Sequence, residues 1–193
     1  MFDQALSSMK TVEVSAFRDF TIAQEKRKME IRKSTMKDLP AIMKMYEEAR
    51  QFMRENGNPD QWGHTNPKEE WIIMDIEDGD SYVCVEEEKI VGTFFYKMGE
   101  DSTYNRIYDG SWMEDSPYGV VHRITTDRRA RGTASFCLKW AVEKSGGHLR
   151  IDTHEDNLPM KNLLEKLGFS RRGTVIVEDG TKRIAFEITY CLK

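Results

Sequence analysis

The sequence predicts an α/β fold built on a mixed β-sheet, and three observations lead to this class. After residue 28, runs rich in β-branched and aromatic residues alternate with runs that have the apolar spacing of helices. The order begins with one strand and two helices, and it ends with a hairpin pattern over residues 173–191. Alternating strands and helices favour parallel pairing, whereas a hairpin pairs its strands antiparallel, so the expected sheet contains both kinds.

The first strand and the first helix come from residues 30–57. Residues 30–34 form a short strand-like run, and residues 36–57 carry apolar side chains three and four residues apart. Asp38 is the expected N-cap, and Gly57 ends the pattern. We therefore expect a helix that packs one face against the sheet.

A loop, a second helix and a hairpin follow. Residues 58–67 combine prolines, a glycine and Trp62, which is the composition of a loop. A second helix is expected over residues 66–79. Residues 81–87 and 90–98 are β-branched and aromatic runs that meet at a charged turn, so they predict a β-hairpin.

The second half of the chain continues the alternation. Residues 100–117 have no clear period and are left unassigned. Residues 118–126 and 148–156 read as strands. One helix is expected to begin near Gly132, and another to occupy residues 158–169.

Composition and charge limit the function classes. The 193 residues are enough for one domain, which we place at residues 29–193, after an N-terminal extension over residues 1–28 that is either helical or loosely held. The net charge of −4 argues against nucleic-acid binding. The 3 cysteines lack the spacing of a metal site, which favours reduced thiols and a cytoplasmic location. We expect no metal, no signal peptide and no membrane span.

The segment DRRARGTASFCLKWA, residues 127–141, gathers arginines just before its glycine, Gly132. The apolar spacing after Gly132 indicates the start of a helix. The first amides of a helix have no intrahelical acceptors, so they can bind phosphate where the backbone is accessible, and a glycine provides that access. The alternative is a solvated basic turn.

Three motifs in this chain resemble the GNAT family of N-acetyltransferases. Arg129-x-x-Gly132-x-Ala134 matches the family signature [Q/R]-x-x-G-x-[G/A]. YGVVHRITT, residues 118–126, is similar to the strand before that signature, and NLPMKNLLEKLGF, residues 157–169, is similar to the ending N-x-x-A-x-x-L-Y-E-K-L-G-F. The resemblance implies the GNAT acyltransferase fold, a mixed and mostly antiparallel sheet of roughly six to seven strands flanked by about four helices.

This resemblance also implies a cofactor site. Acetyl-CoA, as a cosubstrate, would bind in a V-shaped opening between the strand near residues 120–126 and the strand near residues 148–153. Main-chain groups of Ile124 and Thr126, and the side chain of Asn157, would hold its pantetheine arm. Its pyrophosphate would lie on backbone amides of the glycine segment, namely those of Arg129, Ala130, Arg131, Gly132, Thr133, Ala134 and Ser135.

The chain departs from the family pattern at the position of the general acid. The family often has a tyrosine where this chain has Leu164, so that role has no assigned residue. The loop between Thr126 and Arg129 is also slightly shorter than is usual. A thiol pKa near ~8.5 makes unaided departure of coenzyme A feasible, and water or a hydroxyl such as that of Tyr118 could supply the proton.

The acceptor side of the reaction needs a base. A primary amine is neutral in only about 1 in 2,500 molecules at pH 7. His122 is the leading candidate, because it lies on the strand beside the expected thioester, where it should share a face with Ile124 and Thr126. A structural role for His122 is the alternative, and the other candidate bases are Asp152, His154 and Glu155.

These elements lead to an expected function. Four aromatic residues lie in loops or at strand edges, and they suggest a pocket for a small amine with apolar bulk, with acidic residues nearby in sequence. The aromatic residues are Trp62, Tyr104, Trp112 and Tyr118, and the acidic residues are Asp60, Asp109, Glu114 and Asp115. We expect an N-acetyltransferase acting on an amino acid, metabolite or antibiotic by direct attack, since Cys84 and Cys137 fit packing positions. The alternative is a non-catalytic acyl-CoA-binding sensor or interaction module. A homodimer is left open.

Overall fold

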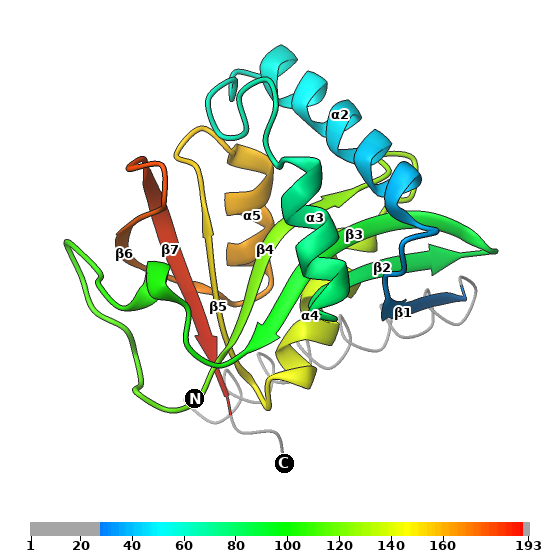
Figure 1. Cartoon of the computed structure of the whole chain (residues 1–193). Coiled ribbons are helices and arrows are strands. Elements are labelled where there is room, and N and C mark those ends of the chain that lie inside the picture. Colours follow the sequence, from blue (N-terminus) through cyan, green and yellow to red (C-terminus); the bar gives the residue numbers. More distant parts are fainter. Residues whose placement is uncertain (1–27, 191–193) are drawn as a thin grey trace, which may run out of the picture.

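The computed structural model describes residues 28–190, which form one seven-stranded sheet with helices on both faces (Figure 1). The strands are β1 (Met29–Lys33), β2 (Ser81–Glu86), β3 (Lys89–Met98), β4 (Gly119–Thr126), β5 (His148–Thr153), β6 (Ser170–Ile176) and β7 (Lys182–Thr189). They lie in the order β1-β2-β3-β4-β5-β7-β6, and β4 and β5 make the single parallel pair of this described sheet.

The helices of the described residues are α2 (Leu39–Glu55), α3 (Glu69–Glu77), α4 (Thr133–Lys144) and α5 (Leu158–Lys166), with a short 3-10 helix, η1 (Ser102–Tyr104). The expected mixed, mostly antiparallel sheet with about four helices is therefore confirmed. Within residues 28–190, no helix combines the length and the apolar composition that crossing a membrane requires. The predicted extension before residue 28 lies outside the described residues.

The helices cover the two faces of the sheet in pairs. α2 and α3 pack on one face, where Ile42, Tyr46 and Ile72 are almost completely buried against β2. α4 and α5 cover the other face, where Leu138 and Leu164 are completely buried. Each fully buried side chain of this kind stabilises the fold by about 1.5–3 kcal/mol, so the sheet is held from both sides.

Asp38 precedes α2 as predicted, but it does not cap the helix. Its carboxylate accepts hydrogen bonds of 2.8 Å from both terminal nitrogens of Arg32 and another of 2.8 Å from the amide of Thr35. The hydrogen bond from Arg32 is the main reason that the pKa of Asp38 falls to about 2. The predicted N-cap position is confirmed, but the side chain of Asp38 makes no capping hydrogen bond and instead ties the start of α2 to β1.

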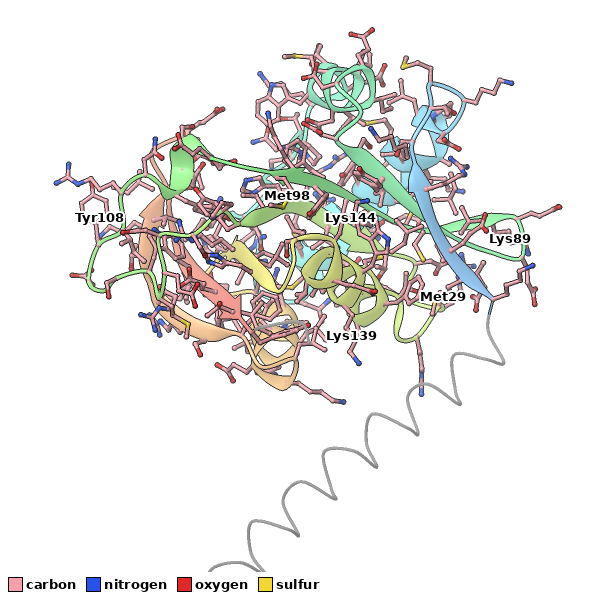
Figure 2. The ribbon with its side chains drawn as sticks, turned by 90° about the horizontal axis from the view of Figure 1, so that it is seen from below. Met29, Lys89, Met98, Tyr108, Lys139 and Lys144 are labelled. Carbon is pink, nitrogen blue, oxygen red and sulfur yellow. The ribbon has the colours of Figure 1, made fainter. Side chains whose placement is uncertain are left out.

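The long connection between β3 and β4 had no predicted structure. After η1 it runs over the outer strands, where Tyr108 pairs with Thr174 of β6 in an isolated β-bridge. Tyr108 lies at the opposite end of the molecule from Lys89, in the β2–β3 hairpin (Figure 2). The connection therefore contacts β6, one of the two strands nearest the C-terminus.

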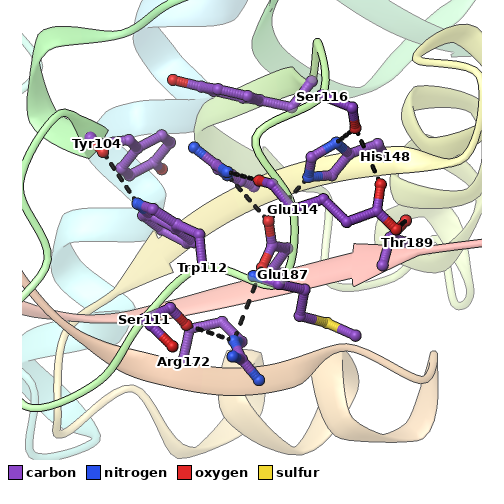
Figure 3. A network of polar contacts seen from close by, with 12 residues as sticks. Tyr104, Ser111, Trp112, Glu114, Ser116, His148, Arg172, Glu187 and Thr189 are labelled. Atoms are coloured by element: carbon purple, nitrogen blue, oxygen red, sulfur yellow. Dashed lines mark hydrogen bonds and ion pairs between the residues drawn. The ribbon is translucent and has the colours of Figure 1, made fainter.

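A buried network of charges anchors this connection (Figure 3). The side chain of Glu187 on β7 is completely buried, and its Oε1 accepts a hydrogen bond of 3.0 Å from Arg150 and lies 2.8 Å from Nε2 of His148. The amide of Met113 donates to the same carboxylate, and the Ser116 hydroxyl lies 2.9 Å from Nδ1 of His148. Because an unpaired buried charge is costly, this pairing fixes the connection against β5 and β7.

Candidate active site

An extra residue in β4 interrupts its pairing with β3. His122 pairs with Phe95. Two positions earlier in β3, Thr93 pairs with Thr125, which is three positions later in β4. Arg123 has a φ of 53°, in the left-handed region, and lies within this irregular stretch. The inserted residue is therefore a β-bulge, and Arg123 carries its unusual backbone conformation.

Beyond the bulge, β4 and β5 no longer pair. Their parallel pairing runs from Gly119 with Leu149 to Val121 with Ile151 and ends there. The hydroxyl of Tyr46, from α2, donates a 3.0 Å hydrogen bond to the carbonyl of Arg123 just past this point. The gap that follows lies between the two strands where an opening was expected.

The bulge separates His122 from the residues with which it was expected to share a face. Ile124 packs against the core under α4, the core that also contains Val121. Around Gly92, the methyl of Thr126 lies on the same side as Thr133 of α4. The prediction that His122 shares a face with Ile124 and Thr126 is therefore wrong, because an inserted residue reverses the alternation of side chains along a strand.

The ring of His122 lies between two carboxylates. Its Nε2 is 2.9 Å from Oδ2 of Asp101, and its Nδ1 is 3.6 Å from Oδ2 of Asp152. Tyr104 donates a 2.9 Å hydrogen bond to that oxygen of Asp152, and its ring lies 5.7 Å from the His122 ring. An ionised carboxylate can only accept, so Nε2 is assigned the hydrogen in the contact with Asp101. The orientation of the imidazole is thereby fixed.

The protonation of the neighbouring groups suits this arrangement. Burial raises the pKa of Asp101, but the hydrogen bond and charge of His122 and the hydrogen bonds of Thr103 outweigh burial and lower it to about 2. Asp101 is therefore ionised at neutral pH. Burial and the charge of Asp152 raise the pKa of Tyr104 well above its usual value, so Tyr104 stays a hydrogen-bond donor.

A cavity of about 520 Å³ opens beside His122. Trp62, from the loop between α2 and α3, lines it, with its ring edge-on to Tyr46 at 5.5 Å. Acidic side chains outnumber arginines in its wall; the acidic residues are Asp75, Asp78, Asp101, Asp152, Glu178 and Asp179, and the arginines are Arg123 and Arg183. We name this space the acidic cavity. Its charge favours a positively charged molecule.

A second cavity, of about 740 Å³, lies on the other side of the gap. Its lining includes Ile124, Thr126, Arg129, Ala134 and Asn157 from the predicted cofactor site, together with Phe52 and Met53 of α2. We name this space the α2 cleft. It shares Met53, Ile124, Asn157 and Met160 with the acidic cavity, so the two spaces meet at the point where β4 and β5 part.

Hydrogen bonds within the glycine segment leave only some of its backbone amides available to bind a phosphate. Gly132 has a φ of 88° and directly precedes α4, as predicted. The amides of Arg129 and Ala130 already donate to Asp127, and that of Thr133 points to the Ala130 carbonyl at 3.4 Å. Within residues 28–190, three predicted amides have no acceptor, those of Gly132, Ala134 and Ser135. These three are free for a ligand.

Trp112 and Tyr118 were predicted to contact the acceptor, but they do not line either cavity. The Trp112 ring nitrogen donates a 3.0 Å hydrogen bond to the carbonyl of Tyr104. The guanidinium of Arg150 lies 4.2 Å from the Trp112 ring centre and 3.9 Å from that of Tyr118. Both aromatic rings thus pack around the buried charge network. Trp62 is the member of the predicted set that reaches the acidic cavity.

Leu164 and the two described cysteines are buried in the core under α4 and α5. The neighbouring Cys84 thiol and burial raise the pKa of Cys137 well above its usual value, which makes it a poor nucleophile. Among residues 28–190, no cluster of three or more His, Cys, Asp or Glu side chains is arranged to hold a metal ion. The titratable side chains beside the gap are those of His122 and its two carboxylate neighbours, Asp101 and Asp152.

Several residues of the site could not be identified from the sequence. Asp101 lies in the connection that had no periodicity, and only the fold brings it to His122. Tyr104, from the same connection, was expected on the acceptor side, but its contact with His122 was not. The acidic residues of α3, Asp75 and Asp78, follow Trp71 at helical spacing. That spacing indicates a common face, but it does not reveal that a cavity lies in front of it.

Comparison with known proteins identifies the family. A sequence model described as the acetyltransferase (GNAT) family matches residues 39–169. No curated protein matches the chain. A GNAT-family acetyltransferase structure from Streptococcus agalactiae is 32% identical over 84% of this chain and 95% of that one, with a TM-score of 0.76.

More distant structures share the fold alone. A GNAT-family acetyltransferase from Bacillus cereus is 22% identical, covers 86% of this chain and 99% of its own, and has a TM-score of 0.55. A chain of the NatC complex, solved with Gag peptide and CoA, is 15% identical, covers 86% of this chain and 99% of its own, and has a TM-score of 0.54. With its family match over most of its length, the chain belongs to the acetyltransferase (GNAT) family.

Proposed function

We propose that this protein transfers the acetyl group of acetyl-CoA to the primary amine of a small molecule, with His122 as the general base. One observation carries the proposal. The imidazole of His122, oriented by Asp101 at 2.9 Å, lines the acidic cavity beside the gap where that cavity meets the α2 cleft. A base in this position stands between a cofactor on one side and an acceptor on the other.

The residues of the α2 cleft fit acetyl-CoA. Its diphosphate needs donors, and the amides of Gly132, Ala134 and Ser135 stand unoccupied at the start of α4. Main-chain groups of Ile124 and Thr126, beyond the last pairing with β5, would hold the pantetheine arm as a strand does. The side chain of Asn157 also lines this cleft. When bound here, acetyl-CoA supplies the acetyl group as an activated thioester.

His122 would remove the proton that keeps the acceptor unreactive. At pH 7, deprotonating an alkylammonium ion to the neutral amine costs about 4.6 kcal/mol of free energy, and a base must help to supply it. Because Nε2 faces Asp101, the lone pair lies on Nδ1 and accepts the proton there. The ring then carries a positive charge, which Asp101 and Asp152 stabilise from either side.

No protein acid is assigned to the departing thiolate. Leu164 has no proton to donate, and the hydroxyl of Tyr118 lies 3.4 Å from the Asp101 amide, away from both cavities. A thiol with a pKa near ~8.5 leaves without a strong acid at neutral pH, so water can supply its proton. Direct attack by the amine agrees with the burial of Cys84 and Cys137, and these free thiols also support a cytoplasmic location.

The shape of the acidic cavity supports a small acceptor. Three separate segments close around it, namely the loop between α2 and α3, the stretch from Asp101 to Thr103, and the turn between β6 and β7. A pocket of about 520 Å³ lined by three segments suits a small molecule. The NatC structure was solved with a peptide, so peptides belong among the acceptors to be tried.

One observation favours a second candidate, an acyl-CoA-binding module without turnover. The position at which relatives often carry a tyrosine is Leu164, completely buried in this chain. Binding of acetyl-CoA by calorimetry, without release of thiol across a broad panel of amines and peptides, would support this alternative.

The decisive experiment is a comparison of His122→Gln with the unchanged protein. We expect kcat/KM for a competent amine to fall by about 10²–10⁴-fold, while the Kd for acetyl-CoA changes little. The measurement is thiol release together with calorimetric titration. His154→Gln is the matched control, because His154 lines neither cavity. Equal activity of His122→Gln and the unchanged protein would remove His122 from the mechanism.

A further inference from the structure

We infer, on the basis of the proposed function, that the acceptor carries a second positive charge, as in an aliphatic diamine or polyamine. The reacting amine would lie beside His122, and the second ammonium would lie at one of the unpaired carboxylates in the wall of the acidic cavity, Asp78 after α3 or Glu178 in the β6–β7 turn. The inference names the class of acceptor, which the family assignment leaves open.

The first support is the face that α3 presents to the acidic cavity. Trp71, Met74, Asp75 and Asp78 all line it, and their spacing puts them on one side of the helix. Trp71 and Met74 are 39% and 58% exposed, which is high for large apolar side chains. An apolar stripe beside carboxylates complements methylene groups that end in an ammonium.

The second support is that some carboxylates of the acidic cavity are paired with a cation and others are not. Asp75 is neutralised by Arg123, whose Nη2 lies 2.6 Å from Oδ2 of Asp75. The carboxylates of Asp78 and Glu178, in contrast, make no hydrogen bond or ion pair with another residue of the described range. Asp78 also lies directly after the last turn of α3, where the helix dipole disfavours negative charge. A bound cation would compensate either group.

A third and independent feature points to a ligand in the same cavity. Thr153, at the end of β5, is 1% exposed, and its hydroxyl has no hydrogen-bond partner among the described residues. It lines the acidic cavity next to Asp152. A buried hydroxyl without a partner is unfavourable, and a bound molecule with a polar group beside β5 would satisfy it.

The same wall disfavours acceptors that carry a carboxylate. Arg183 is engaged already, through Thr181 at 2.6 Å and the carbonyl of Gln61 at 3.2 Å. Arg123 is neutralised by Asp75. Arg183 contacts only neutral oxygen atoms and makes no ion pair with a described carboxylate, but it faces six acidic side chains in the lining of the cavity. A free amino acid would therefore bring its carboxylate close to carboxylates of like charge.

The test uses acceptors with the same four-carbon arm and different far ends. Thiol release with acetyl-CoA is measured for 1,4-diaminobutane, butylamine and 4-aminobutanoate, with spermidine as a longer polyamine. We expect kcat/KM for the diamine or spermidine to exceed that for butylamine at least about tenfold, and 4-aminobutanoate to be the poorest. Butylamine or 4-aminobutanoate as the best acceptor would overturn the inference.

Substitutions assign the preference to the wall. Asp78→Asn combined with Glu178→Gln should reduce the diamine advantage to about threefold or less, while activity with butylamine changes little. Glu77→Gln is the matched control, since Glu77 neighbours Asp78 in sequence but does not line the cavity. An unchanged diamine preference in the double variant would contradict this assignment.

A binding measurement separates this inference from the proposed function. 1,4-Diaminobutane and butylamine are titrated into the protein saturated with coenzyme A. Diamine binding that exceeds butylamine binding tenfold, without turnover of any amine, would support the acceptor class and overturn the proposed acetyl transfer. Turnover of butylamine without any preference for the diamine in binding would support the proposed acetyl transfer and overturn the inferred acceptor class.

Discussion

Two histidines of this protein, His122 and His148, make nearly the same contact and stand in opposite surroundings. Nε2 of His122 lies 2.9 Å from Asp101, and Nε2 of His148 lies 2.8 Å from Glu187. The His122 ring lines a cavity, whereas His148 is 5% exposed and its carboxylate partner is completely buried. A histidine–carboxylate pair therefore serves chemistry only where a reactant can reach it, and elsewhere it holds the fold.

The buried pair has a further feature that resembles a catalytic arrangement. Ser116, His148 and Glu187 follow each other at hydrogen-bond distances, the order of a serine-based triad. The Ser116 hydroxyl, however, donates to Glu114 at 3.0 Å, and Arg150 binds the carboxylate of Glu187. Neither cavity includes Ser116. We interpret these residues as the anchor of the β3–β4 connection.

The largest expected difference between the two pairs is in stability. Glu187→Gln leaves Arg150 and His148 without their buried negative partner, so we expect the free energy of unfolding to fall by about 3–5 kcal/mol. Denaturant unfolding measures this loss. The kcat/KM of the fraction that remains folded should change little, and a large kinetic loss at full folding would break the distinction drawn above.

The corresponding change at the pair that lines the acidic cavity should act on kinetics instead. Asp101→Asn removes the charge that orients His122, and we expect kcat to fall about 10–100-fold with little change in KM for acetyl-CoA. Steady-state kinetics measure this effect. A variant that lost stability and kept its full kcat would place Asp101 with the structural residues.

Asp101 also contributes to stability in acid, with a defined sign. Its folded pKa of about 2 is below the ordinary value of 3.8, so the ionised form is favoured by folding. That contribution is complete above pH 3.8 and is lost as the pH falls to about 2. Acid unfolding of Asp101→Asn should lack this part of the slope, with Asp60→Asn as a control at an exposed site outside both cavities.

The smallest differences should come from the hydroxyls next to each pair. Tyr104→Phe removes one hydrogen bond, and Ser116→Ala removes the contacts with Glu114 and His148. Each lost hydrogen bond should cost about 1 kcal/mol of stability. Only Tyr104→Phe should affect catalysis, by about fivefold in kcat, because its hydroxyl holds the Asp152 carboxylate beside His122. Equal kinetics of the two variants would show that Asp152 does not depend on Tyr104.

The periodic parts of the sequence predicted the fold well for a physical reason. The buried faces of α2 and α4 repeat every three to four residues, and Gly132 marks the start of α4 with a backbone conformation suited to glycine. The hairpin of β2 and β3 follows from local composition. These features depend on neighbours in the chain, so the sequence contains them directly.

The site was harder to predict because its geometry depends on distant segments. The sequence of β4 has a regular strand pattern that gives no sign of the bulge at Arg123. Because of this bulge, His122 lies on the opposite side of the strand from Ile124 and Thr126. Asp101 comes from a connection without periodicity. Trp112 and Tyr118 are aromatic residues of the kind that often contact ligands. In this protein both rings instead pack against Arg150 in the buried charge network. Aromatic residues near acidic ones in sequence do not define a pocket.

The end of the β4–β5 pairing after Val121 has a consequence for the dynamics of the backbone. The parallel pairs from Gly119 to Val121 close the sheet, whereas the next residues of β4 have a strand on only one side. Amide hydrogens that face the gap should therefore exchange with solvent deuterium sooner than those of the closed part. A ligand that lies along this edge would slow their exchange, and it would take the place of the missing neighbouring strand.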